Sequence, residues 1–141
     1  MIVPATRQPS RTLLIVDDET TILFAITRFF KARGFSIESA ADLAGAVARL
    51  EQSCPDVAII DLRLGGLGDT QGLDVLDRVR ARCPNTKTLL LTAYGTRQVE
   101  VEARRRGADV VLHKPTPLVE LAEEVTRLLA ERADPGRGAE G

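Results

Sequence analysis

Residues with reactive side chains follow four short apolar runs of this chain, and they are Asp17, Asp18, Asp61, Thr92 and Lys114. Carboxylates held together repel each other, by about 4 kcal/mol for unit charges 4 Å apart at an effective dielectric of ~20. A cation would neutralise such a group, and oxygen ligands favour Mg²⁺ or Mn²⁺ over Zn²⁺. One carboxylate would then be free to act as a nucleophile, with the hydroxyl and ammonium groups as donors to an anion formed there.

These residues can act together only if the elements that carry them converge. Five short runs, largely apolar, are the expected strands, at 12–16, 35–39, 56–60, 87–91 and 109–113. The stretches between them have apolar residues at helical spacing, although the segment 96–106 has few large ones. The alternation predicts an α/β fold, a doubly wound parallel sheet with helices on both faces and right-handed crossovers. Ligands bind at the carboxyl edge of such sheets, so the reactive residues should lie together there.

Composition argues against several functional classes. The chain has 141 residues with 19 basic and 20 acidic side chains, so its formal net charge of −1 provides no attraction to nucleic acid or anionic lipid. Tryptophan is absent, and the first ten residues lack the apolar segment of a signal peptide. No apolar run approaches the roughly 20 residues of a membrane helix. We expect a cytoplasmic protein that binds neither membrane nor nucleic acid directly.

The two cysteines, Cys54 and Cys83, each precede a proline. They form no CxxC unit and no pattern of metal ligands. The sequence therefore favours two reduced thiols near the ends of helices.

Length and composition indicate one domain with short tails. We expect a tail over residues 1–10, a folded domain over 11–132, and a Gly- and Pro-rich tail over 133–141. The sequence shows no second core, helix-turn-helix or basic recognition segment after residue 132. Either the domain acts by protein contact alone, or its effector lies outside this chain.

Four motifs in order resemble a known family. They are LIVDDE (14–19), VAIIDLRL (57–64), LTAYG (91–95) and HKP (113–115). Over about residues 11–132 the chain resembles the receiver domain of bacterial two-component response regulators, of the chemotaxis-regulator type. The resemblance implies a flavodoxin-like (βα)5 fold with strand order 2-1-3-4-5.

The resemblance also implies a Mg²⁺-dependent phosphoacceptor site. Asp61 would receive a phosphoryl group from the phosphohistidine of a sensor histidine kinase or a phosphotransfer protein. The metal ligands would be Asp17, Asp18, Asp61 and the backbone carbonyl of Arg63. Lys114 would pair with the phosphoryl oxygens and would precede a cis proline, Pro115.

The same resemblance implies a switch. The side chains of Thr92 and Lys114 would move towards the new phosphoryl group. This movement would alter the face formed by the fourth helix, fifth strand and fifth helix. The protein that responds to this change would be a downstream protein or an effector domain outside this chain. The resemblance also allows a homodimer through that face.

Several features depart from the common receiver pattern. Gly72 lies eleven residues after Asp61, where eight is usual, and glycines 65, 66 and 68 should make this longer loop mobile. Val111 stands where an aromatic residue is usual, so Tyr94 is either a substitute switch residue or an exposed loop tyrosine. Arg63 either reaches the phosphoryl group or is a solvated surface side chain.

The same residues also allow other interpretations. Asp17 and Asp18 could simply favour the start of a helix. Arginines 104–106 are either a solvated helix end or a contact for an acidic partner, and His113 is expected to be structural. A haloacid-dehalogenase-like phosphatase would need an acid two residues after the nucleophile, where Arg63 stands. The main alternative is a pseudo-receiver that binds proteins and is not phosphorylated.

Overall fold

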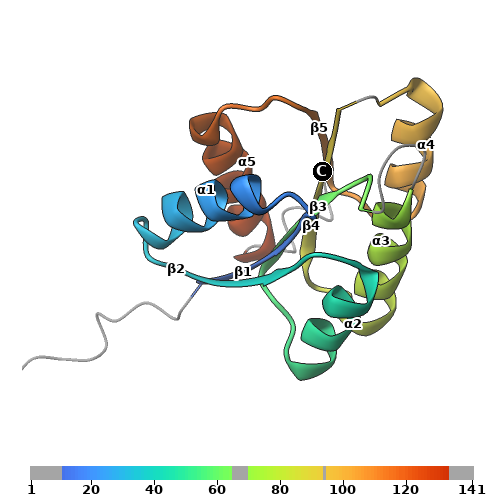
Figure 1. Cartoon of the computed structure of the whole chain (residues 1–141). Helices are drawn as coiled ribbons and strands as arrows, with labels where there is room; N and C mark the ends of the chain where they lie inside the picture. Colours follow the sequence, from blue (N-terminus) through green and yellow to red (C-terminus); the bar gives the residue numbers. More distant parts are fainter. Residues whose placement is uncertain (1–10, 65–69, 94, 134–141) are drawn as a thin grey trace, which may run out of the picture.

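The computed structural model describes residues 11–64, 70–93 and 95–133. Strands and helices alternate along the chain (Figure 1). In order they are β1 (Arg11–Val16), α1 (Thr20–Lys31), β2 (Phe35–Ala40), α2 (Leu43–Gln52), β3 (Val57–Asp61), α3 (Gln71–Arg82), β4 (Lys87–Thr92), α4 (Arg97–Arg105), β5 (Val110–His113) and α5 (Leu118–Ala133). The five strands predicted from the sequence are confirmed, and none of their boundaries is displaced by more than one residue.

All five strands pair in parallel in the order β2-β1-β3-β4-β5. Helices α1 and α5 cover one face of the sheet, and α2, α3 and α4 cover the other (Figure 1). The doubly wound fold and its strand order are therefore confirmed.

The core forms two clusters because alternate residues of each strand face opposite sides of the sheet. On β1, Leu13 and Ile15 pack with α1 and α5, whereas Leu14 and Val16 pack towards α2 and α3. The central strand β3 is buried along its whole length. This burial on both faces explains why the strands were recognisable as continuous apolar runs.

Local signals end and begin the helices as the sequence indicates. Gly34 after α1 and Gly107 after α4 have φ of +93° and +112°, a conformation that glycine adopts without strain. The side chains of Asp42 and Thr96 accept hydrogen bonds from backbone N–H groups in the first turns of α2 and α4. The expected cis peptide between Lys114 and Pro115 is present. No helix in the described ranges is long and apolar enough to cross a membrane.

The prediction of two reduced cysteines is wrong. Cys54, just after α2, and Cys83, at the end of α3, form a disulfide. The two positions are 29 residues apart, and they meet because each lies a few residues before one of the adjacent strands β3 and β4. Spacing along the sequence could not show this contact, because it depends on the order of the strands.

Gly72 brings the start of α3 unusually close to the end of β3. A Cβ atom at this position would lie 2.4 Å from the backbone oxygen of Asp61 and 2.6 Å from Cα of Leu62. The Gly72 N–H donates a hydrogen bond to the Leu62 carbonyl at 2.9 Å. Only glycine permits this approach, which places the start of α3 directly against the end of β3.

We predict that Gly72→Ala destabilises the domain by about 1–3 kcal/mol, because backbone atoms rather than a flexible side chain must move. Urea unfolding followed by circular dichroism measures the change. Gln52→Ala, at the exposed end of α2, is the control and should stay near wild type. Equal stability of Gly72→Ala and wild type would show that the backbone at Asp61 and Leu62 can move to make room for the added methyl group at little cost.

Candidate functional site

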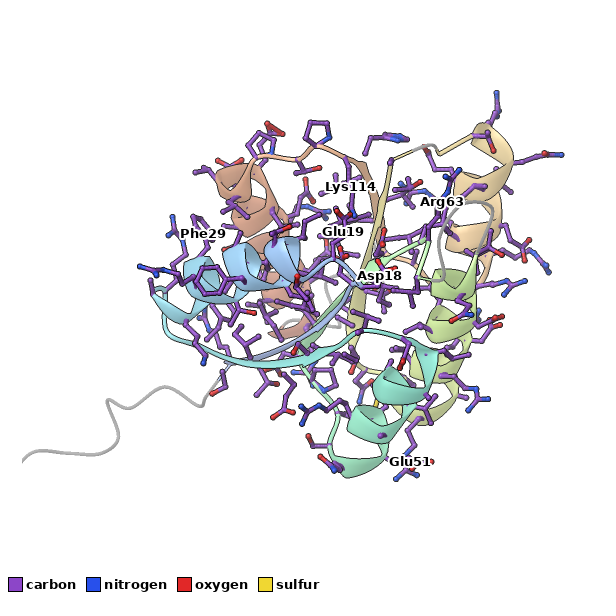
Figure 2. All side chains as sticks on the ribbon, in the orientation of Figure 1. Asp18, Glu19, Phe29, Glu51, Arg63 and Lys114 are labelled. Atoms are coloured by element: carbon purple, nitrogen blue, oxygen red, sulfur yellow. A yellow bond between two sulfur atoms is a disulfide. The ribbon has the colours of Figure 1, made fainter. Side chains whose placement is uncertain are left out.

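The register of the sheet brings the predicted residues to one edge. Val16 pairs with Ile60, so Asp17 and Asp61, the next residue on each strand, are level with each other. Thr92 pairs with His113, which places Lys114 directly beyond. Figure 2 shows Asp18, Glu19, Arg63 and Lys114 around this end of the strands, with Glu51 at the opposite end.

The three aspartates form a compact group of oxygen donors. One carboxylate oxygen from each of Asp17, Asp18 and Asp61 can be chosen so that all lie within 4.8 Å of one another. Asp17 and Asp61 are buried, whereas Asp18 is exposed and open to solvent. Oxygen donors at such separations suit a hard divalent cation that keeps part of its water shell. The residues therefore fit the Mg²⁺ or Mn²⁺ expected from the sequence.

Lys114 lies across the gap between the two buried carboxylates. Its Nζ is 3.3 Å from Oδ2 of Asp17 and 3.2 Å from Oδ1 of Asp61, with Glu19 further away at 3.8 Å. Burial opposes the charge of the Lys114 ammonium, but the two aspartates outweigh this and raise its pKa. The ammonium is thus held positive beside Asp61.

Asp61 is itself an unusual carboxylate. Burial, followed by the charge of Asp17, raises its pKa from 3.8 to about 6, although Lys114 and the backbone N–H of Arg63 partly oppose the shift. The side chain remains 7% exposed at the edge of the sheet. It is therefore a desolvated carboxylate whose ionised form is stabilised by any added positive charge.

Thr92 ends β4 next to this group. It is buried, and its carbonyl accepts a hydrogen bond from the Lys114 N–H at 2.8 Å, so the two residues are tied through the backbone. A Cβ atom on Gly95 would lie 2.7 Å from Cγ2 of Thr92, which keeps the following loop close. Of the other predicted switch residues, Val111 is buried in the core, and Tyr94 lies outside the described residues. The loop glycines 65, 66 and 68 also lie outside them.

Sequence reasoning missed a network that ties α4 to α3. Arg106 contacts Glu102 of α4 at 2.7 Å and Asp77 and Asp74 of α3 at 3.0 and 3.5 Å. Of the nine residues of α4, all of them described, only Ala103 is buried. The ion pairs of Arg106 thus connect α3 to a helix that buries few apolar side chains. The triplet of arginines gave no sign of the link to α3, because Asp74 and Asp77 lie 29 or more residues earlier in the chain.

His113 also has a partner that the sequence did not reveal. Its Nε2 lies 3.3 Å from a carboxylate oxygen of Glu100 on α4. The contact joins β5 to α4 at the exposed rim of the site.

Comparison with known proteins identifies the family. The family model for the response regulator receiver domain matches residues 13–126. This chain belongs to that family. A receiver domain protein (CheY-like) from Methanospirillum hungatei has the same fold, with a TM-score of 0.83 and 27% identity over 90% of this chain and 99% of that one.

Curated relatives of this receiver domain are longer regulators. It is 38% identical over 127 residues to the acid tolerance regulatory protein ActR of Sinorhizobium medicae. It is 34% identical over 124 residues to the photosynthetic apparatus regulatory protein RegA of Rhodobacter capsulatus. The matches cover 90% and 88% of this chain, but only 64% of either relative. The receiver therefore corresponds to part of these proteins.

The raised pKa of Asp61 predicts how the stability of the receiver depends on pH. Between pH 4 and 6 the folded chain keeps a proton on Asp61 that the unfolded chain has lost, so this group makes stability fall as pH rises. In EDTA at pH 7.5, Asp61→Asn should be more stable than wild type by about 1–3 kcal/mol, and the difference should vanish by about pH 4.

Urea unfolding at the two pH values measures this difference. Glu123→Gln removes an exposed carboxylate from α5 and should show no comparable gain. If Asp61→Asn had wild-type stability at both pH values, the ionised carboxylate would carry no penalty in the fold.

Proposed function

We propose that this receiver is a phosphoacceptor switch in which Asp61 takes a phosphoryl group from a sensor histidine kinase or a phosphotransfer protein. The proposal rests on one observation above all. A desolvated Asp61 carboxylate lies 3.2 Å from the Lys114 ammonium and beside two further carboxylates that suit a divalent metal. This combination has a nucleophile, a fixed positive charge and a place for a second one.

In the proposed reaction, an oxygen of Asp61 attacks the phosphorus of a phosphohistidine. The O–P bond forms as the P–N bond breaks, and the imidazole leaves with the electron pair. Phosphoryl transfer depends mainly on positioning and charge neutralisation, which Lys114 supplies from the β5 side. The product is an acyl phosphate on Asp61, and the receiver releases no free product. It is thus a signalling module rather than a conventional enzyme.

We propose that Asp17, Asp18, Asp61 and the carbonyl of Arg63 hold Mg²⁺, with Mn²⁺ as an alternative. The metal would neutralise negative charge on the phosphoryl oxygens. The donor chemistry supports this assignment, since all candidate ligands are oxygens and one face of the group, at Asp18, is exposed. We assign the Arg63 side chain no role in the transfer.

The response would pass through Thr92 and Lys114. An acyl phosphate brings new acceptor oxygens, so the Thr92 hydroxyl and the Lys114 ammonium are the donors placed to move towards it. Their hydrogen-bonded backbones link β4 to β5, and the change would then reach the α4-β5-α5 face. Tyr94 is proposed as an additional switch residue. Val111 is too small to act as the usual aromatic partner of the threonine.

The alternative function is a pseudo-receiver that binds proteins without being phosphorylated. Two features favour the pseudo-receiver. Val111 stands where receivers usually have an aromatic residue, and the loop after Asp61 is longer than usual. The intact arrangement of Asp17, Asp61 and Lys114 favours the phosphoacceptor, because a docking surface needs no like charges buried together.

We propose that the domain spans residues 11–132, between tails, and works in the cytoplasm. Its output would be a downstream protein or an effector domain outside this chain, in keeping with its 64% coverage of ActR and RegA. A homodimer through the α4-β5-α5 face is a further option, and we propose no direct contact with nucleic acid or membrane.

Intact-mass spectrometry after incubation with acetyl phosphate tests the proposal. We expect a single phosphoryl adduct that requires Mg²⁺ and is absent from Asp61→Asn. Lys114→Gln should label about 10²-fold more slowly or worse, since it removes a preorganised positive charge. Asp77→Asn makes the same chemical change as Asp61→Asn at an exposed position of α3, and it should label like wild type.

Two results would reject the phosphoacceptor. One is a folded wild-type chain that forms no adduct with Mg²⁺ or Mn²⁺, which would favour the pseudo-receiver. The other is equal labelling of Asp61→Asn, which would place the modification on another residue.

A further inference from the structure

The Cys54–Cys83 disulfide lies away from the phosphoacceptor site. Both cysteines precede strands, so they lie at the amino edge of the sheet, whereas the aspartates follow strands at the carboxyl edge. The bond joins the end of α2 to the end of α3. Nothing in the proposed phosphoryl transfer uses it, so its role needs a separate explanation.

The two sulfur-bearing residues differ sharply in exposure. Cys54 is exposed, whereas Cys83 is 2% exposed and belongs to the core beneath α2 and α3. An external thiol can therefore reach the bond from one side, that of Cys54. This asymmetry decides which sulfur is attacked and which one leaves.

A small hollow lies between the same two helices, lined by residues close in sequence to both cysteines but not by the cysteines themselves. The hollow measures about 220 Å³ and is lined by Val47, Leu50, Glu51, Arg78, Ala81 and Arg82. Arg82 links the hollow to the disulfide, because its side chain donates to the Glu51 carbonyl at 3.3 Å while its own carbonyl lies 3.8 Å from Sγ of Cys54.

The hollow also has a net positive lining. It combines apolar walls with two guanidinium groups, from Arg78 and Arg82, and one carboxylate, from Glu51. A guanidinium pair next to a reactive bond favours an anionic reactant by attraction and by hydrogen bonds to carboxylates.

We propose that the Cys54–Cys83 disulfide is a thiol–disulfide exchange site for a small anionic thiol, which approaches from the hollow and attacks Cys54. The chemical class is a peptide-sized thiol that carries carboxylates. Disulfides in reducing compartments are usually transient rather than permanent. The argument that the bond is transient rests on the proposed cytoplasmic function. The exposure of Cys54 and the charges of the hollow do not depend on that function.

The exchange is balanced in two steps. A thiolate of the small thiol attacks Sγ of Cys54, the protein S–S bond breaks, and Cys83 leaves with the electron pair and takes up a proton. A second thiolate attacks the outer sulfur of the mixed disulfide and releases Cys54 as a thiolate. Two small thiols are thereby oxidised to one small disulfide, and the protein disulfide is reduced to two thiols. The reverse reaction closes the bond again.

Intact-mass spectrometry after acid quenching, on the native chain in mixtures of reduced and oxidised glutathione, tests the exchange. We expect the disulfide form and the dithiol form to interconvert without denaturant. Folded Cys83→Ser should form a mixed disulfide with one glutathione at Cys54. In folded Cys54→Ser, glutathione should modify Cys83 at least tenfold more slowly. Opening of the bond only after unfolding, or equal modification of the two single variants, would overturn the proposal.

Melting temperature provides a second readout that does not depend on glutathione. Reduction releases a cross-link over 29 residues, so the melting temperature should fall by about 10 °C. The double variant Cys54→Ser with Cys83→Ser should melt at the lower temperature and be insensitive to reductant. No shift on reduction of the wild type would mean that the bond does not form in the folded chain.

A series of thiols of different charge tests the class of reactant. At equal thiolate concentration and low salt, anionic glutathione should reduce the bond about fivefold faster than cationic cysteamine, with neutral 2-mercaptoethanol between them. Arg78→Gln with Arg82→Gln should abolish the preference, whereas Arg97→Gln on α4 should retain it. Equal rates for all three thiols would overturn the assignment of an anionic reactant.

This test is separate from that of phosphorylation. Asp61→Asn should exchange thiols at the wild-type rate, because the two sites lie at opposite edges of the sheet. Failure of labelling by acetyl phosphate would thus leave the exchange measurement intact, and failure of exchange would leave the phosphoacceptor intact.

Discussion

The contact on which the rest of the site depends is that of the Lys114 ammonium with the carboxylates of Asp17 and Asp61. Two buried negative charges level with each other on adjacent strands would destabilise the fold if no positive group lay between them. Lys114 supplies that charge from just past β5, so the two carboxylates gain this positive partner only when β5 is paired into the sheet. Burial, followed by the charge of Asp17, raises the pKa of Asp61. One positive charge for two buried negative ones leaves an excess of negative charge, which suits the site to a cation.

The parallel sheet explains how residues spread over nearly a hundred positions meet. Four of the strands contribute residues at or just past their carboxyl ends, and the common direction of the strands gathers these residues at one edge. Gly72 extends this logic to the helices, since α3 starts against the backbone of Asp61 itself. The site is therefore built from strand ends, and the start of α3 is packed against the backbone of Asp61.

Local patterns in the sequence predicted the alternation of strands and helices, whereas the strand order came from the resemblance to receivers. Apolar runs identified the strands, and the residues after them identified Asp17, Asp61 and Lys114. The sequence failed for the disulfide and for the Arg106 network, because both join segments whose closeness depends on strand order and helix placement. Two cysteines that each precede a proline look alike in the sequence. Only the fold shows that one is exposed, the other is buried, and the two are joined.

The shallow seating of α4 has an energetic consequence for signalling. A helix that buries a single alanine loses little apolar contact when it shifts, so its position is set mostly by the ionic contacts of Arg106 and the Glu100–His113 pair. Contacts of this kind at a surface contribute roughly 0–1 kcal/mol each and weaken as salt rises. Weak surface contacts therefore hold the helix, and a small change in free energy at the end of β4 is enough to shift the helix without disturbing the core.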